Sequence, residues 1–469
     1  MIIGGVAVKR IAVLLLAVSM LLGLSACGGE TEEPTVPAKL GEGLNAGYCK
    51  IDITPDYEVG IGGYSDAETR RSQAVADHLY ATCIALTYEK NTVLLYTVDT
   101  CAIDRAAAEY FRVLIMANTG VPAENIFFGA THCHSAPSIG GQYKDDLMQW
   151  LVSAGRKAIV DQSPAKLLAA TPEIEGMNFV RHYEMEDGTY AGSNFGDFSK
   201  KIVGHATQSD THAVLLKFDR EAGRKDILLV NWQAHPDSAG AIGYTSLAAS
   251  WVGPLRDELE KRSGMQVAYF TGASGNQNIS SKIWWENNHL SWKSYGRKMG
   301  KLLYKALPQL QEMQTGEIRA SRLMVDAQID HSWDPMLDAA NEVYDLWKTQ
   351  GKEKGDALGK TYGFTSSYQA RAIRSRAAMG EAAQLELNVI SVGDVAFTTG
   401  TYEMFSDAGL YVKENSPFPV TFLITGNSGY IPSKKAYEYR SYEADTGLYA
   451  PGTAEKLAEE YVKMLNSIR

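Results

Sequence analysis

The sequence predicts an α/β fold in which central mixed β-sheets are flanked by helices within a single large domain. From Gly47 onward, short apolar runs alternate with longer amphipathic ones, which is the pattern of alternating strands and helices. Between residues 78 and 131, strands and one helix follow one another at the spacing of a βαβ unit, which implies parallel strands. The chain has 469 residues, of which 45% are hydrophobic, so it can form a large core, and its sequence contains no visible repeat.

The individual elements follow from local patterns. Residues 78–88 and 92–99 are apolar runs that predict two strands. Residues 102–120 predict an amphipathic helix that ends at a glycine cap, and residues 125–131 predict the next strand. Further strands are predicted at 212–219, 226–235, 266–273, 317–329, 383–392, 395–402 and 420–426, and further helices at 143–160, 251–261, 292–310, 335–347, 367–379, 403–412 and 454–465.

The polar segment 347–367 interrupts this pattern. Its sequence, WKTQGKEKGDALGKTYGFTSS, looks like an excursion from the core. This favours a flexible loop or lid over a domain boundary. We therefore expect one α/β domain with decorated loops.

The N-terminus has the pattern of an export signal. Lys9 and Arg10 precede the apolar run IAVLLLAVSMLLGL, and LSAC follows at residues 24–27, which resembles the lipobox of bacterial lipoproteins. The run is too short for an ordinary spanning helix, so we interpret residues 1–27 as a cleaved lipoprotein signal peptide; a retained membrane anchor is the alternative. Cys27 would then be lipidated, and the protein would be exported and anchored to the cell envelope. Residues 28–45 are expected to form a flexible tether before the body at 46–469.

Charge and cysteine content narrow the possible partners. The formal net charge is −10, and removal of residues 1–27 takes away Lys9 and Arg10 and no acid, which gives −12. This balance argues against a nucleic-acid partner, because phosphate binding needs a basic face. Four cysteines remain after Cys27, and an exported protein could pair them, although a domain of this size does not require disulfides. They are Cys49, Cys83, Cys101 and Cys133.

The segment FFGATHCHSAPSIGG carries the first candidate site. His132 and His134 flank Cys133 just beyond a predicted strand, and Asp99 ends the strand before it. The carboxyl ends of strands are where open α/β sheets place their ligands. If the segment is extended, residues 132 and 134 face the same way and Cys133 faces the other, which suits a metal and disfavours Cys133 as a nucleophile. A buried histidine pair or an exposed strand end remains the alternative.

Other candidate residues also follow predicted strands. His235 ends an apolar strand and precedes Pro236, Glu403 lies where a helix would begin, and Tyr430 and Tyr442 lie in a glycine-containing stretch near the C-terminus. Each has an ordinary alternative role. A glutamate in a first helical turn complements the helix dipole, and loop tyrosines commonly serve in packing or hydrogen bonding.

Nine short blocks give these residues a common context. The chain resembles the N-terminal catalytic domain of the neutral/alkaline ceramidase family, which has comparable ITP, T-H-x-H-S-x-P, H-P-T-like, G-A-S-G-D-like and G-Y blocks in the same order. The H-x-H-S block combined with the later HP and GY blocks is highly specific. The blocks are AGYCKIDITP, IGGYSD, DHLYATCIAL, LLYTVDT, FFGATHCHSAP, NWQAHPDS, FTGASGNQN, ISVGDVAFTTGTYEMF and NSGYIPSKKAYEYRSYE.

The resemblance implies one zinc ion. In the family, the first histidine of the H-x-H block, the histidine of the HP block, a glutamate after a late strand and the tyrosine of the GY block bind it. The matching residues here are His132, His235, Glu403 and Tyr430. Two imidazoles, a carboxylate and a phenolic oxygen suit zinc with a position open for water. That water would attack an amide carbonyl.

The resemblance also implies catalytic neighbours. His134 would contact the substrate or carry a proton to the departing amine without binding zinc. Tyr442 and Arg181 match residues that stabilise the oxyanion, although His182 beside Arg181 makes that block less exact. Asp99 is expected to orient a site residue or a turn, not to react.

Three departures from the family pattern stand out. The block that continues G-D-V-S-P in other members is GNQNIS here, so no serine nucleophile is expected at that place. The immunoglobulin-like C-terminal domain of larger members is expected to be absent. Residues 334–379 have no evident counterpart and could reshape the substrate entrance.

The expected activity is zinc-dependent cleavage of the amide of ceramide or a related N-acyl lipid into a fatty acid and a sphingoid base. One alternative is an amidase that acts on smaller N-acyl or cell-wall compounds. Another is a non-catalytic surface lipoprotein that binds an extracellular ligand, since a net negative α/β body suits that class as well.

Overall fold

A computed structural model describes residues 40–64, 69–221, 223–283, 290–426 and 428–469. The predicted signal peptide, its lipidation site Cys27 and most of the predicted tether lie outside these residues. Strand β1 begins at Leu44, two residues before the predicted start of the body at residue 46. Within the described residues, no helix is both long and apolar enough to cross a membrane.

The larger of two stacked sheets has nine strands. Its order is β14-β12-β11-β6-β1-β3-β4-β5, and β16 pairs with β6. The pairs β4/β5 and β12/β14 are parallel and the others antiparallel, so the sheet is mixed as predicted. The strands are β1 (Leu44–Asp52), β3 (Tyr80–Tyr88), β4 (Asn91–Val98), β5 (Ile126–Ala130), β6 (Ser163–Ala170), β11 (Val214–Arg220), β12 (Ile227–Trp232), β14 (Gln266–Thr271) and β16 (Gln311–Glu312).

The predicted βαβ unit is present. Helix α2 (Arg105–Thr119) connects the parallel strands β4 and β5. Asp104 caps its N-terminus by accepting a hydrogen bond from the Ala107 amide at 2.7 Å. Gly120, with φ of 74°, ends it in the left-handed conformation that glycine adopts without strain. Strand β5 therefore runs parallel to β4, as the spacing of the βαβ unit predicts.

The second sheet packs face to face with the first. Its four strands run in the order β17-β18-β19-β21, namely β17 (Ile318–Gln328), β18 (Ala382–Val392), β19 (Val395–Gly400) and β21 (Val420–Thr425). Phe127 and Phe270 of the first sheet meet Phe397 and Phe422 of the second in one buried cluster. Burial of this apolar area between the sheets is the main stabilising contribution to the stack.

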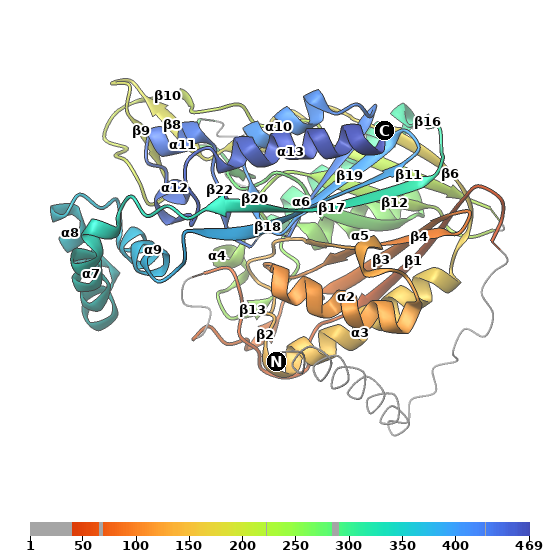
Figure 1. Ribbon diagram of the computed structural model, residues 1–469, viewed down its shortest axis with the longest axis horizontal. Helices are drawn as coiled ribbons and strands as arrows, with labels where there is room; N and C mark the ends of the chain where they lie inside the picture. Colours follow the sequence, from red (N-terminus) through yellow and green to blue (C-terminus); the bar gives the residue numbers. More distant parts are fainter. Residues whose placement is uncertain (1–39, 65–68, 222, 284–289, 427) are drawn as a thin grey trace, which may run out of the picture. The chain divides into compact units, whose positions relative to one another are not determined.

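Helices cover the outer faces of both sheets (Figure 1). On the larger sheet, α2 and α3 (Gly141–Val160) pack over one half, and α5 (Val252–Ser263) and α6 (Trp292–Ala306) pack over the other. On the smaller sheet lie α10 (Ser406–Asn415) and α13 (Thr453–Ile468). The order helix, sheet, sheet, helix confirms the predicted α/β class.

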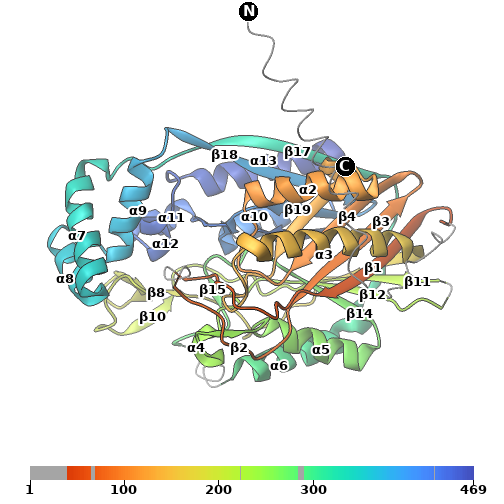
Figure 2. The same ribbon diagram turned by 90° about the horizontal axis from the view of Figure 1, so that it is seen from below.

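Residues 334–379 form a helical unit. The prediction of a flexible loop or lid at 347–367 is wrong, because helix α8 occupies most of that segment. The unit consists of α7 (Leu337–Gln350), α8 (Lys352–Thr361) and α9 (Ser367–Ala377), which lie at one end of the sheets (Figure 2). Gly355 and Gly359 lie on the face of α8 toward α7: an added Cβ would come within 2.7 Å of Trp347 at Gly355 and within 3.5 Å of Val343 at Gly359. Because glycines occupy this face, α8 has no period of large apolar residues.

The strands β1 and β6 of the larger sheet and several short elements were not predicted from the sequence. Two-residue strands carry too little periodicity to be recognised. They are β2 (Ala74–Val75), β7 (Phe179–Val180), β13 (Ser246–Leu247), β15 (Gln277–Asn278), β20 (Glu403–Met404) and β22 (Tyr430–Ile431); β8 (His182–Met185), β9 (Tyr190–Gly192) and β10 (Ile202–His205) form a further small sheet, and α4 (Ala239–Ile242), α11 (Lys434–Glu438) and α12 (Tyr442–Thr446) are short helices.

Candidate metal centre

The carboxyl ends of strands from both sheets meet at one place. Thr271, the last residue of β14, donates a hydrogen bond to the carbonyl of Thr131 just after β5, at 2.9 Å. Thr425, the last residue of β21, donates to the carbonyl of Thr271 at 3.1 Å. His132 therefore lies beside the strand ends of the second sheet. This is the location that strand-end reasoning predicts for a ligand site.

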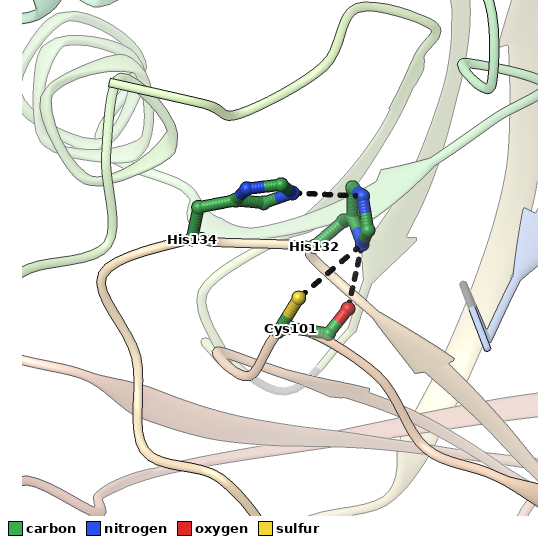
Figure 3. Close-up of side chains that lie close together, drawn as sticks. All are labelled: Cys101, His132 and His134. Carbon is green, nitrogen blue, oxygen red and sulfur yellow. Dashed lines mark hydrogen bonds between the residues drawn. The ribbon is translucent and has the colours of Figure 1, made fainter. Parts of the chain in front are cut away.

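The H-x-H segment converges as predicted, but not because it is extended. His132 has φ of 62°, a left-handed conformation that is uncommon outside glycine, and the strand has already ended at Ala130. The resulting bend still directs His132 and His134 to one side (Figure 3). Cys133 turns into the core and contacts the Ala249 carbonyl at 3.1 Å. Burial raises the pKa of this thiol well above its usual value, so it is a poor nucleophile.

Three imidazole nitrogens lie within hydrogen-bond distance of one another. Nε2 of His132 is 2.9 Å from Nε2 of His235 and 3.1 Å from Nε2 of His134, and the remaining pair is 3.2 Å apart. All three side chains are buried. The Glu403 carboxylate completes the cluster, with Oε2 3.3 Å from Nε2 of His132.

Backbone carbonyls fix the tautomers of two of these histidines. Nδ1 of His132 lies 2.6 Å from the Cys101 carbonyl (Figure 3), and Nδ1 of His235 lies 3.3 Å from the Ser274 carbonyl. A carbonyl oxygen only accepts hydrogen bonds, so each Nδ1 must carry the proton. Each Nε2 then presents its lone pair to the cluster. This arrangement is typical of metal-binding histidines.

Glu403 and Tyr430 are brought together by strand pairing. Glu403 lies in β20, three residues before helix α10 begins, so the expected position in a first helical turn is wrong. β20 pairs in parallel with β22, and Glu403 is the direct partner of Tyr430 in the register. Burial and the nearby Glu403 raise the pKa of Tyr430, while Arg181 lowers it, and the raising effects are larger.

The residues present fit a metal ion. Oε2 of Glu403 is buried and has no hydrogen-bond partner among the described residues. If both rings are neutral with the proton on Nδ1, Nε2 of His132 and Nε2 of His235 face each other at 2.9 Å without a hydrogen between them. A cation would satisfy both lone pairs and the carboxylate oxygen at once, and His, Glu and Tyr donors are compatible with zinc. His132, His235 and Glu403 form a cluster of suitable ligand atoms within 4.8 Å.

His134 differs from the other two histidines. Its Nδ1 is buried and has no hydrogen-bond partner in the described part of the chain; the nearest acid is Asp237, whose Oδ1 lies 3.8 Å away. The ring of Tyr64 packs edge-on against it, with centroids 5.2 Å apart. Burial lowers the pKa of His134 to about 3, so the side chain is neutral at neutral pH.

Arg181 is held beside the cluster by a buried carboxylate. Its Nη2 donates to the Tyr430 hydroxyl at 3.1 Å, and its Nε donates to Oε1 of Glu443 at 2.7 Å. The other oxygen of Glu443 lies 2.8 Å from Nε2 of His182. Although burial opposes the charge on Glu443, His182 and Arg181 lower the pKa of this carboxyl to about 2. His182 thus contacts the same carboxylate that holds Arg181 in place.

Tyr442 lies next to the same group and touches the helical unit. Its ring centroid is 6.3 Å from that of Tyr430 and 5.7 Å from that of Tyr368 in α9. Burial raises its pKa to about 12. The segment without evident family counterpart therefore contacts one of the predicted site residues.

Asp99 holds the start of the H-x-H segment in place through side-chain contacts with Thr131 and Arg256. It forms a two-point ion pair with Arg256 at 3.0 and 2.6 Å, and it accepts a hydrogen bond from Thr131 at 3.1 Å. Thr131 directly precedes His132. These contacts agree with the expectation that Asp99 orients a site residue.

Sequence analysis missed three residues of this site. Glu443 directly follows Tyr442, and Asp237 follows His235 by two positions, so proximity to a predicted residue was the available signal. Tyr64 lies in the block IGGYSD, which supported the resemblance without being assigned a role. The cysteines Cys49, Cys83, Cys101 and Cys133 are all free thiols in the structure.

Comparison with known proteins gives a match at the level of structure. No protein-family model and no curated protein matches the chain. Among the solved structures that do match, neutral ceramidase from Pseudomonas aeruginosa has a TM-score of 0.65 and 17% identity over 91% of this chain and 74% of that one. A ceramidase complexed with C2 has a TM-score of 0.66 and 16% identity over 91% and 75%. The chain thus has the fold of neutral ceramidase, which confirms the fold that the resemblance implied.

Proposed function

We propose that the chain is a zinc-dependent amidohydrolase of the neutral ceramidase family. It cleaves the N-acyl amide of ceramide or a related N-acyl lipid into a fatty acid and an amine. The single observation that carries the proposal is the convergence of His132, His235 and Glu403 in a chain with the ceramidase fold. A solute-binding lipoprotein has no need for imidazole nitrogens that converge beside a buried carboxylate.

In this proposal, zinc is held by His132, His235, Glu403 and Tyr430. When bound, it supplies a Lewis acid that activates water and polarises the amide carbonyl. The carbonyls of Cys101 and Ser274 keep the two histidines in the ligating tautomer. A cation next to Tyr430 would also favour ionisation of its phenol, against the effect of burial.

His134 moves the proton. Its Nε2 lies 3.1 Å from Nε2 of His132 and 3.2 Å from Nε2 of His235, and in this proposal it takes a proton from the attacking water and then gives it to the nitrogen of the departing amine. Arg181 and Tyr442 act on the carbonyl oxygen, where negative charge develops during attack. The guanidinium is already aligned by Glu443 and Tyr430, so little reorganisation is needed when the charge forms.

The test measures metal content and hydrolysis together. Purified protein is expected to contain about one zinc per chain and to release fatty acid from a fluorescent ceramide, and a chelator should abolish release. His132→Ala and His235→Ala should lose zinc and activity. The control is His78→Ala, since His78 is 61% exposed and should retain both. Full activity in either site variant would refute the metal assignment.

A chain-length panel separates the two substrate classes. N-acyl amines with acyl chains from two to eighteen carbons should show kcat/KM rising with length if an N-acyl lipid is the substrate. A flat response would favour the alternative, an amidase for small N-acyl or cell-wall compounds.

We also propose that the protein is exported and lipid-anchored through Cys27. The supporting observation is the sequence of residues 1–27. Metabolic labelling with a radioactive fatty acid should mark the wild-type chain but not the Cys27→Ala variant. Equal labelling of both would refute this anchor.

A further inference from the structure

Helix α6 carries five basic residues and no acidic one. Its sequence is WKSYGRKMGKLLYKA, in a chain whose formal net charge is −10. Four of the basic positions are spaced by four residues, which places them along one side of a helix. They are Lys293, Arg297, Lys301 and Lys305, and Lys298 lies beside them. The surface of α6 therefore differs in sign from the chain as a whole, and the proposed function assigns it no role.

Packing of the opposite side of α6 turns the basic side to solvent. Tyr295, Met299 and Leu303 are buried in the cluster that joins α6 to α5 and the larger sheet, whereas all five basic residues are exposed. An added Cβ at Gly296 would come within 2.2 Å of the Trp251 carbonyl, so the inner side fits closely. The rotation of α6 about its axis is thereby fixed. The helix lies at the outer edge of the molecule, on the side away from α13 (Figure 2).

A groove of about 370 Å³ runs between the exposed side chains of α6. All its lining residues belong to this helix, namely Ser294, Arg297, Lys298, Lys301, Leu302 and Lys305. Within the described ranges, Arg297, Lys301 and Lys305 form no ion pair. The acid Glu258 of α5 lies near Lys301, but it is already paired with Arg262. The groove therefore presents positive charge that no carboxylate of the described chain neutralises.

This arrangement suits an extended anionic surface. Like charges spaced by four residues repel one another, so a partner of opposite charge stabilises the helix. The basic side extends over roughly 18 Å from Lys293 to Lys305, since each residue of a helix rises about 1.5 Å, which is more than one small anion spans. Clusters of basic residues on an amphipathic helix are typical of sites for anionic lipids. Tyr304 on the same helix is 38% exposed, and tyrosine is common where protein meets the membrane interface.

The N-terminal end of α6 adjoins the metal centre. Trp292, its first residue, lines a cavity of about 360 Å³ whose lining also includes His235 and Tyr244. The Tyr244 side chain is 57% exposed, so this cavity has an open side. A surface in contact with α6 therefore also lies close to this cavity.

We propose that the exposed side of α6 docks on a lipid bilayer with anionic headgroups, and that Arg297, Lys301 and Lys305 contact the lipid phosphates. Each basic residue near such a surface strengthens the attraction about fivefold. Docking holds the cavity beside His235 close to the bilayer, from which an N-acyl lipid can enter it. Only this last consequence rests on the proposed function.

The test is lysine labelling of the full chain in two kinds of vesicle. One contains phosphatidylcholine alone, and the other contains equal parts of phosphatidylcholine and phosphatidylglycerol. A water-soluble acetylating reagent is added, and mass spectrometry gives the rate for each lysine. Lys293, Lys301 and Lys305 should react severalfold more slowly in the anionic vesicles. Lys463 on α13, which is 65% exposed, should react equally in both.

Salt and charge removal test the electrostatic origin of the protection. At about 1 M sodium chloride the screening length falls to about 3 Å, so the difference between the vesicles should disappear. The triple variant Arg297→Gln, Lys301→Gln, Lys305→Gln should weaken docking by about 100-fold. Lys293, which this variant retains, should then react as fast in anionic as in neutral vesicles.

A matched variant removes the same charge elsewhere. Lys348→Gln, Lys354→Gln, Lys360→Gln alters exposed residues of α7 and α8 and should keep the protection of α6. Equal labelling of α6 in the two kinds of vesicle, or full protection in the α6 variant, would overturn the proposal. Protection of α6 in neutral vesicles by inorganic phosphate would also overturn it, in favour of a site for free anions. Protection by soluble polyglutamate but not by anionic vesicles would overturn it in favour of an acidic protein partner.

These measurements involve neither zinc nor hydrolysis, so the proposal and the proposed function can fail separately. Protection of α6 in a chain that cleaves no ceramide would support docking and refute the hydrolase. Cleavage of ceramide by a chain whose α6 lysines are unprotected would refute docking alone.

Discussion

Replacement of Glu443 by glutamine tests how the buried carboxylate supports the site. Glu443 is 1% exposed and lies between Arg181 and His182, at 2.7 and 2.8 Å. Glutamine has nearly the same shape but no charge. The guanidinium of Arg181 would remain buried beside the cluster without its counter-ion, which is the costly way to break a buried ion pair.

The pKa of Glu443 gives the expected size of the effect. Its lowering from 4.5 to about 2 corresponds to about 3 kcal/mol, on the order of 1.4 kcal/mol per pKa unit. Because the folded-state pKa is depressed, this stabilisation is fully present above pH 4.5 and is lost as the pH falls toward 2. Glu443→Gln should therefore reduce the free energy of unfolding by about 3 kcal/mol at pH 7, and the difference from wild type should shrink below pH 4.5.

Urea unfolding at pH 7 and pH 3.5, together with steady-state kinetics, provides the assay. Without the Glu443 carboxylate, Arg181 should move by about 1 Å, and a displacement of that size can lower kcat by about 100-fold. The zinc content of the variant should stay near one ion per chain. The control is Glu312→Gln, since Glu312 is 61% exposed and should change stability by no more than about 0.5 kcal/mol. A loss below 1 kcal/mol at pH 7, or an equal loss at both pH values, would refute this account.

Three further predictions concern the surroundings of the site. Asp99→Asn should cost about 3–5 kcal/mol in urea unfolding, because it leaves Arg256 buried without its partner; a loss under 1 kcal/mol would contradict the pair's role. Tyr368→Ala should lower kcat severalfold at constant zinc content, since α9 loses its ring contact with Tyr442; unchanged kinetics would show that the helical unit does not position the tyrosine. Cys133 should resist iodoacetamide at pH 8 in native protein and react in urea, as burial raises its pKa; mass spectrometry showing native labelling would contradict its burial.

Much of the fold follows from local patterns. The strands β4 and β5 and helix α2 were predicted from periodicity and from the cap at Gly120, because each depends on neighbours in the sequence. Helix α8 was not predicted. Its close contact with α7 uses glycines, so its buried face carries no large apolar residues. Two-residue strands such as β20 and β22 exist only through their pairing with each other.

The H-x-H segment shows how a correct expectation can have an incorrect reason. Extended alternation predicted that His132 and His134 converge and that Cys133 faces away, and the side chains do so. The backbone achieves this through a left-handed residue at His132 instead of a strand. Tertiary contacts hold that conformation, since Asp99 binds Thr131 and the Cys101 carbonyl binds His132.

The sequence by itself determined the α/β class and the order of most of the main elements, because periodicity is a local property of the chain, whereas the four expected zinc ligands followed from the resemblance to a known family. The tertiary structure decided the distances between the site residues. Only the stacking of two sheets brings His132 and His235 to the Glu403–Tyr430 pair, and only long-range packing provides Glu443 as the counter-ion of Arg181. Such contacts join segments far apart in sequence, so no local pattern encodes them. The same is true of the cavity formed by Tyr64, Asp237 and Asn278 beside His235.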